Sequence, residues 1–181
     1  AEIEGSKKLL SQAKKTKKLE LEVINKSDST IVLSDIERDL LLTEVSGVNI
    51  HKIPLILDIP GRSQGFEDRK GLLFIGGFRH TPNIDAVIYF TSEIWPLIKA
   101  KQPDIKFTII GSHPPKEVLD LDGNGINIVG FVSDISEYFN NALISVAPLR
   151  YGAGIKGKIG TSLSYGVPVV GTTIATEGMG I

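Results

Sequence analysis

The sequence predicts an α/β fold in which helices flank a parallel sheet. Between residues 71 and 172, five short apolar runs alternate with segments whose apolar residues have helical spacing. Such alternation is typical of βαβ units. Because ligands of parallel sheets bind where the strands end, a site is expected in the loops that follow the five runs, which are residues 76–82, 111–115, 130–134, 148–157 and 171–178.

The first sixty residues have a weaker pattern. Helix formers fill residues 2–22, and two short strands are predicted at residues 30–34 and 49–53. Ser34, followed three residues later by Glu37, predicts a capping box for a helix that ends near residue 46. The next segment, residues 61–70, is polar and contains glycine, so it is predicted to be a linker at a domain boundary.

The pattern after residue 71 is regular. The strands are expected at residues 72–75, 105–110, 126–129, 143–147 and 168–172. The helix that begins at Pro82 contains Pro96, which should kink or split it. Ser133 is expected to cap a helix that runs to Asn140. Short helices are also predicted after the second strand and after the Gly-rich loop that follows the fourth.

Composition excludes several classes of protein. Cysteine is absent, so disulfides, thiolate metal sites and thiol nucleophiles are excluded. No apolar run is long enough to span a membrane, and no secretory signal is evident, so a cytoplasmic protein is expected. The net charge of −1 does not favour a nucleic-acid partner, although residues 1–26 carry seven lysines and four glutamates. A solvated helix face and a peripheral contact with the inner face of a membrane stay open for this stretch.

Residues 148–158 combine the features of an anion site. Three glycines let the backbone approach a ligand closely, and a helix N-terminus follows with its partial positive charge. Three cations, Arg150, Lys156 and Lys158, lie in the same loop. This combination suits a diphosphate. The earlier turn at Gly76 and Gly77 allows another close approach, with Arg79 either a phosphate partner or an ordinary surface residue.

Other phosphate and metal motifs fit poorly. Gly152, Gly157 and Lys158 have the spacing of a P-loop, but Ile159 replaces the hydroxyl residue that binds magnesium. The strand that ends at residue 110 offers no carboxylate for the ribose of a dinucleotide. The three histidines are scattered and have no metal-binding spacing.

Residues 71–178 resemble the C-terminal nucleotide-sugar-binding domain of group 1 (family 4-type) glycosyltransferases, which have the GT-B architecture of two Rossmann-like domains. The similarity is carried by the stretches at residues 73–77, 82–86, 107–111, 130–134, 147–158, 165–172 and 177–178. Residues 30–58 look like the closing strand–helix–strand segment of the family's acceptor domain. The resemblance thus implies three parts: an acceptor-domain remnant (1–60), the linker (61–70) and a Rossmann-like donor domain truncated at its C-terminus (71–181).

The resemblance also implies which residues meet the donor. The loop amides and Lys156 would hold the diphosphate and sugar, and the Gly130-Phe131-Val132 turn would contact the base. Thr161 stands where most members have a glutamate for the ribose, and Ala153 replaces a second family glutamate. No catalytic residue is identified. The expected binding residues are Gly76, Gly77, Arg79, Phe131, Val132, Gly152, Gly154, Ile155, Lys156, Lys158 and Thr161.

The implied function is transfer of a sugar, hexosyltransferase-type, from a nucleoside diphosphate sugar such as a UDP- or GDP-sugar. The acceptor would be a glycan, a lipid or a protein, and neither a cofactor nor a metal is expected. A fragment that lacks most of the acceptor domain should not turn over alone. Because Thr161 replaces the usual glutamate, the alternative is a non-catalytic nucleotide-binding or interaction module of the same fold.

Overall fold

The computed structural model describes residues 7–180. The chain divides between Leu55 and Ile56 into two compact units, which are described separately below. This division lies before the segment 61–70 in which the sequence predicts the boundary.

The first unit is a small α/β element. Its two strands pair in parallel, with Thr30 opposite Ile50. The predicted capping box is confirmed, because the Glu37 amide donates to Ser34 Oγ at 3.2 Å and the Ser34 amide donates to Glu37 Oε2 at 3.1 Å. In chain order the elements are α1 (Lys7–Lys26), β1 (Thr30–Val32), α2 (Asp35–Glu44) and β2 (Ile50–Lys52).

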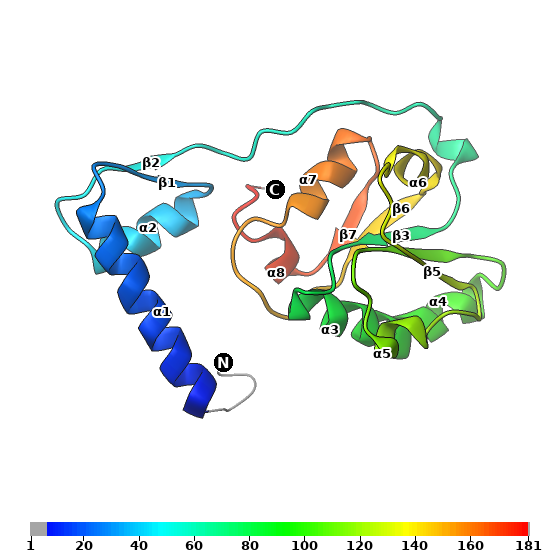
Figure 1. Ribbon diagram of the computed structural model, residues 1–181. Helices are drawn as coiled ribbons and strands as arrows, with labels where there is room; N and C mark the ends of the chain where they lie inside the picture. The colour runs from blue at the N-terminus through cyan, green and yellow to red at the C-terminus, as the bar shows by residue number, and fades with distance from the viewer. Residues whose placement is uncertain (1–6, 181) are drawn as a thin grey trace. The chain divides into compact units, whose positions relative to one another are not determined.

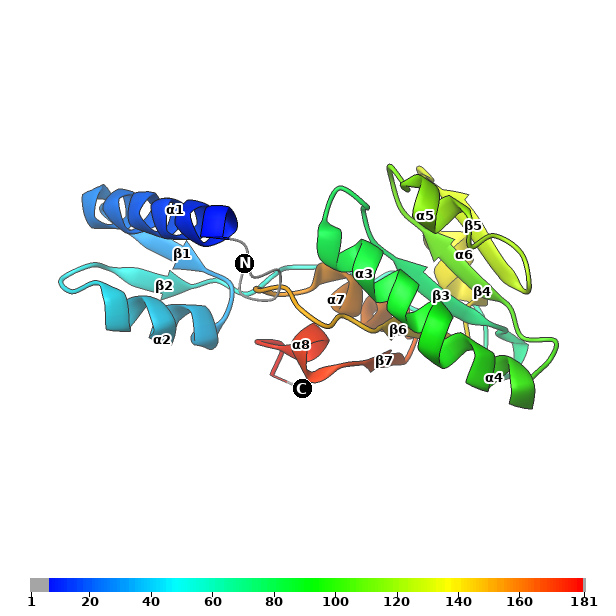
Figure 2. The same cartoon turned by 90° about the horizontal axis from the view of Figure 1, so that it is seen from below.

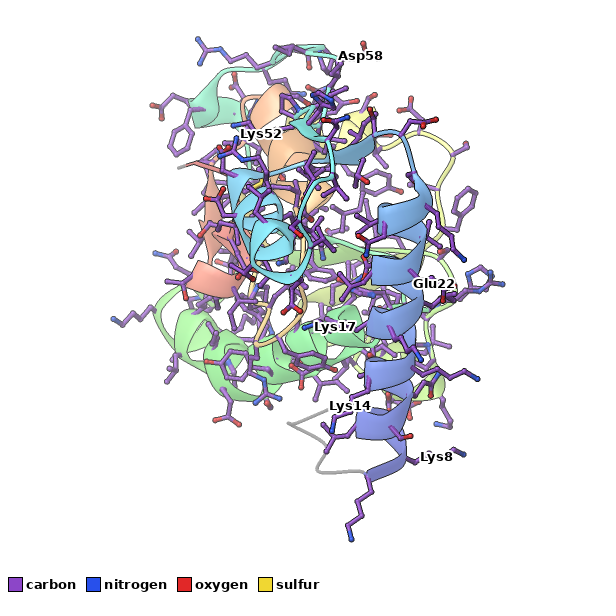
Figure 3. All side chains as sticks on the ribbon, turned by 90° about the vertical axis from the view of Figure 1, so that its left-hand side faces the viewer. Lys8, Lys14, Lys17, Glu22, Lys52 and Asp58 are labelled. Carbon is purple, nitrogen blue, oxygen red and sulfur yellow. The ribbon has the colours of Figure 1, made fainter. Side chains whose placement is uncertain are left out.

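Helix α1 presents most of its length to solvent. Ile24 is its one fully buried residue among those described, and Figure 3 shows Lys8, Lys14 and Lys17 extending from the helix. Lys17 Nζ lies 2.6 Å from Glu44 Oε1, which joins α1 to the end of α2. Residues 2–6 of the predicted helix lie outside the described residues. No helix within residues 7–180 is long and apolar enough to cross a bilayer.

The second unit is built on five parallel strands, as predicted. Their order in the sheet is β5-β4-β3-β6-β7, so the chain order reverses between β3 and β6 (Figure 1). This reversal is the topological switch point, beside which ligands of such sheets bind. The strands are β3 (Leu72–Ile75), β4 (Phe107–Ile110), β5 (Ile126–Gly130), β6 (Ile144–Ala147) and β7 (Val169–Gly171).

Helices cover both faces of this sheet. Along β3, Phe74 packs into the cluster that contains Val87 and Trp95, whereas Leu73 packs into the cluster that contains Phe139 and Val167. A strand that is buried on both faces is expected to be apolar throughout, as β3 is. Figures 1 and 2 show α3 and α4 on one face, with α6 and α7 on the other. The helices are α3 (Thr81–Tyr89), α4 (Trp95–Lys101), α5 (Lys116–Leu119), α6 (Ser136–Asn141), α7 (Gly157–Ser164) and α8 (Thr173–Thr176).

Two local predictions have different outcomes, and one short helix was not predicted. Pro96 splits its helix as expected, because the π-helical turn η2 (Phe90–Ile94) separates α3 from α4. The predicted cap at Ser133 is wrong: the side chain of Asp134 accepts a hydrogen bond from the Ser136 amide at 2.8 Å instead. The amide and hydroxyl of Ser136 lower the pKa of Asp134. Helix α8 was not predicted, since it has only four residues.

The predicted linker, residues 61–70, is part of the second unit and packs against the rest of it. Within it, η1 (Phe66–Asp68) forms a single 3₁₀ turn. The guanidinium of Arg69, which is 4% exposed, donates to the carbonyls of Gly166 at 2.9 Å and Tyr165 at 3.1 Å. The polar residues that suggested a flexible connection therefore bind carbonyls and amides about 80 to 100 positions away in the sequence.

Candidate functional site

Two loops flank the switch point, and both contain glycines that the packing requires. The turn after β3 lies so close to the end of β4 that a Cβ on Gly111 would meet the Gly76 carbonyl oxygen at 2.0 Å. The Gly76 amide donates to the carbonyl of Ile110 at 3.0 Å. Glycine at both positions thus allows the two strand ends to approach each other closely.

Asn83, in the first turns of α3, holds this turn in place. Its Nδ2 donates to the carbonyl of Gly77 at 2.8 Å. A Cβ on Gly76 would lie 2.8 Å from the Asn83 side chain, so that side chain fills the space left by the glycine. Asn83 is only 6% exposed, and it therefore acts as a buried polar support for the loop.

The Gly-rich loop after β6 forms the opposite wall of a small cleft. Gly152 and Gly154 have φ values of +119° and +77°, which residues other than glycine rarely adopt. The cleft has a volume of about 170 Å³. Its lining comes from both loops and comprises His80, Pro82, Asn83, Leu149, Tyr151, Gly152, Ala153, Ile155, Lys156 and Lys158.

Lys156 is the cap residue of α7 and lies in this cleft. Its Nζ donates to the carbonyl of Gly152 at 2.9 Å, which closes the Gly-rich loop on itself. The carboxylate of Glu177 lies 3.6 Å from the same nitrogen, and the Lys156 side chain is only 8% exposed. This ammonium is thus buried beside a single carboxylate that is itself half exposed.

Lys158 is partly buried and has a neutral partner. Its Nζ donates to Asn83 Oδ1 at 2.6 Å and lies 4.3 Å from the centre of the Phe74 ring. Within residues 7–180, no carboxylate oxygen forms an ion pair with it. Burial lowers the pKa of the Lys158 ammonium to about 8.

The cleft is therefore suited to an anion. Two ammonium groups line it, and α7 begins there with the partial positive charge of a helix N-terminus. A buried cation without a counter-ion is costly, and an anionic ligand would remove that cost. The arrangement favours a ligand with phosphate groups over a neutral one.

The other predicted cations lie elsewhere. Arg150, in the same loop as the two lysines, pairs through Nε and Nη2 with the carboxylate of Asp85, and its guanidinium stacks 4.9 Å from the Tyr89 ring. Asp85 raises the pKa of this arginine. The exposed Arg79 contacts Nε2 of His113 at 3.0 Å. Neither arginine lines the cleft.

Of the other predicted residues, Gly152 and Ile155 line the cleft, whereas Gly76, Gly77, Gly154, Phe131, Val132 and Thr161 do not. Phe131 is 76% exposed in the turn after β5, and Val132 packs beside the Phe139 cluster. Thr161 donates its hydroxyl to the carbonyl of Gly157 at 3.0 Å. Its side chain lines a separate open groove of about 540 Å³ with Leu57 and other residues.

Sequence reasoning missed two site residues, Asn83 and Glu177. Both stood in stretches that carried the family resemblance, but neither was given a role. Asn83 follows a proline at the start of a helix, where a polar side chain that is buried needs a partner. The position of Asn83 directly after a helix-starting proline was the sequence signal that could have identified it. Glu177 follows α8, whose existence was not predicted.

Residues 69–180 match the family model of group 1 glycosyl transferases. The chain belongs to the group 1 glycosyltransferases. A relative from Klebsiella pneumoniae, described as an uncharacterized 44.6 kDa protein in the cps region, is 30% identical over 118 residues. That match covers 60% of this chain and 30% of the relative.

Solved structures share the fold of this glycosyltransferase chain. TarM is similar with a TM-score of 0.73 and 22% identity over 88% of this chain and 32% of TarM. A point mutant of S. aureus TarM, in complex with fondaparinux, α-GlcNAc-glycerol and UDP, matches with the same TM-score and identity over 88% of this chain and 33% of its own. The GtfA/B complex gives 0.62 and 17% over 86% of this chain and 32% of its own. The chain thus spans about a third of the length of its relatives.

Proposed function

We propose that the cleft beside the switch point binds the diphosphate of a nucleoside diphosphate sugar. The chain is then the donor-binding part of a glycosyltransferase that moves a hexose to a glycan, lipid or protein acceptor. One observation carries this proposal: the buried Lys156 and the partly buried Lys158 line one cleft at the switch point, and Lys158 has no carboxylate partner among the described residues.

The proposed reaction needs such groups at this place. Negative charge develops on the nucleoside diphosphate as its bond to the sugar breaks. Ammonium groups and amide dipoles that are already oriented stabilise this charge without reorganising. Lys156 is held by the Gly152 carbonyl and Lys158 by Asn83, so both are oriented before a donor arrives.

The comparisons support a nucleotide donor. The matched TarM mutant was solved with UDP, and the first unit of this chain resembles the end of an acceptor domain. Because residues 1–181 correspond to about a third of TarM, we expect this polypeptide to bind a donor product without catalysing transfer. Transfer requires no bound metal in this proposal.

Calorimetric titration with UDP, GDP and ADP tests the proposal. One of the three should bind, and Lys156→Ala should weaken that binding by about tenfold or more, as expected for removal of a buried charged hydrogen-bond donor. Lys99→Met is a matched control, because this lysine, like Lys156, donates to a backbone carbonyl but lies outside the cleft.

The same titration separates the proposal from a non-catalytic interaction module. If the folded chain binds none of the three diphosphates, the donor site is refuted and the module is favoured. Binding that persists unchanged in Lys156→Ala would place the nucleotide elsewhere.

A further inference from the structure

One side chain, Asn83, touches both loops of the cleft. Its Oδ1 accepts from Lys158 Nζ at 2.6 Å, and its Nδ2 donates to the Gly77 carbonyl at 2.8 Å. Lys158 belongs to the helix after β6, and Gly77 to the turn after β3. Asn83 thus connects the two sides of the switch point through a pair of partly buried hydrogen bonds.

We propose that Asn83 is a positioning residue that holds the Lys158 ammonium for a diphosphate and fixes it relative to the turn after β3. This inference rests on the proposed function, because it assigns a role within the same cleft. Asn83 acts through Lys158 in this proposal and is not assigned a contact with the ligand.

The chemistry of Lys158 explains why a holding residue is needed. A lysine side chain is flexible, and ordering it costs conformational entropy. The Phe74 ring lies on one side of the ammonium, and Asn83 Oδ1 accepts one of its three N–H groups. The other two N–H groups have no described hydrogen-bond partner within residues 7–180, so they are available to phosphate oxygens.

The amide of Asn83 is also better suited than a carboxylate. An amide oxygen accepts a hydrogen bond but brings no negative charge, so it orients Lys158 without neutralising it. An aspartate at this position would supply the counter-ion itself and compete with the incoming anion. The choice of asparagine is therefore consistent with a cation that is reserved for a ligand.

The arrangement also makes binding depend on pH. Three other titratable groups line the same cleft as Lys158, namely Lys156, His80 and Tyr151, and Glu177 pairs with Lys156. Since burial lowers the pKa of Lys158 to about 8, Lys158 is a neutral amine in a fraction of the molecules at pH 8. A diphosphate favours the charged form, so its affinity should fall as the pH rises from 7.5 to 9.5.

Titrations with the bound diphosphate across this pH range distinguish four proteins. The unmodified chain should lose affinity as the pH rises. Asn83→Leu should bind about tenfold more weakly at pH 7.5. As the pH rises, its loss of affinity should begin at a lower pH than in the unmodified chain, because the hydrogen bond that favours the charged lysine is gone. Asn83→Asp and Lys158→Met should both bind weakly and with little pH dependence, the first because a carboxylate keeps Lys158 charged and occupied, the second because no amine remains.

Asn140→Leu is the matched control, because this asparagine accepts a hydrogen bond from the Ser63 amide in the second unit and does not line the cleft. It should keep both the affinity and the pH profile of the unmodified chain. Wild-type affinity with the wild-type pH profile in Asn83→Asp would overturn the positioning role, and that variant decides if Asn83→Leu does not fold. If no diphosphate binds the unmodified chain, the proposed function fails first.

Discussion

Lys158→Met changes the dependence of stability on pH, and the structure fixes the size of the change. Burial lowers the pKa of Lys158 from 10.5 to about 8. A shift of this size means that, without a ligand, the charged lysine costs about 3 kcal/mol of folding stability relative to its neutral form. Methionine has a similar length and no charge, so it removes this cost.

The sign follows from proton binding. Between pH 8 and pH 10.5 the unfolded chain holds the Lys158 proton more tightly than the folded chain does. The contribution of Lys158 to the free energy of unfolding is therefore lowest below pH 8. It rises with pH by at most about 1.4 kcal/mol per pH unit. Methionine also loses the hydrogen bond to Asn83, which costs about 1 kcal/mol. We expect Lys158→Met to be about 2 kcal/mol more stable than the unmodified chain at pH 7, and about 1 kcal/mol less stable than it near pH 10.5.

Urea unfolding of both proteins over one pH series measures this difference, and the titration of the other lysines cancels in it. Lys99→Met serves as the control for the loss of a lysine side chain, since this lysine makes similar contacts near the surface. Added diphosphate should stabilise the unmodified chain more than Lys158→Met. A difference between the two proteins that stays constant from pH 7 to pH 10 would refute the buried, uncompensated state of Lys158.

Three further predictions concern contacts elsewhere in the second unit. Gly111→Ala should destabilise the chain by about 3 kcal/mol or more in urea unfolding, because the new Cβ meets the backbone carbonyl of Gly76; Gly77→Ala, whose Cβ has room, should be nearly neutral. Arg69→Ala should cost about 2 to 4 kcal/mol, since the change removes a buried side chain whose guanidinium donates to two backbone carbonyls. A stability within error of the unmodified chain would contradict this account. Arg150→Ala should change stability by less than about 1 kcal/mol, because its pair with Asp85 is exposed. Calorimetry should show that this variant binds the diphosphate as the unmodified chain does. A large loss of binding would place Arg150 in the site.

Local patterns carried most of the fold prediction. The five strands were predicted within two or three residues, because each is a short run of apolar residues followed by glycine or a polar loop. The capping box at Ser34 depends on residues three apart and was predicted correctly. The cap of α6 was not, because the cap position falls on Ile135, which has no polar side chain, while the preceding Asp134 accepts from the Ser136 amide.

The site itself depends on contacts that no local pattern contains. Lys158 and Asn83 are 75 positions apart in the sequence, and Arg150 and Asp85 are 65 positions apart. The Gly-rich loop could be recognised from its composition. Which of its three cations remains available for a ligand depends on where the residues of α3 lie after folding, and this requires the structure.

The contrast within that loop distinguishes a structural cation from one that serves a ligand. Arg150 meets the carboxylate of Asp85 at the surface, where a pair of charges is screened by water and contributes little. Lys158 lies deeper and meets only a neutral amide oxygen and an aromatic ring among the described residues. A carboxylate at position 83 would pair with this ammonium, but it could not donate to the Gly77 carbonyl as Asn83 Nδ2 does. Asparagine serves both groups and leaves the charge of Lys158 without a counter-ion, which is understandable if the counter-ion comes with a ligand.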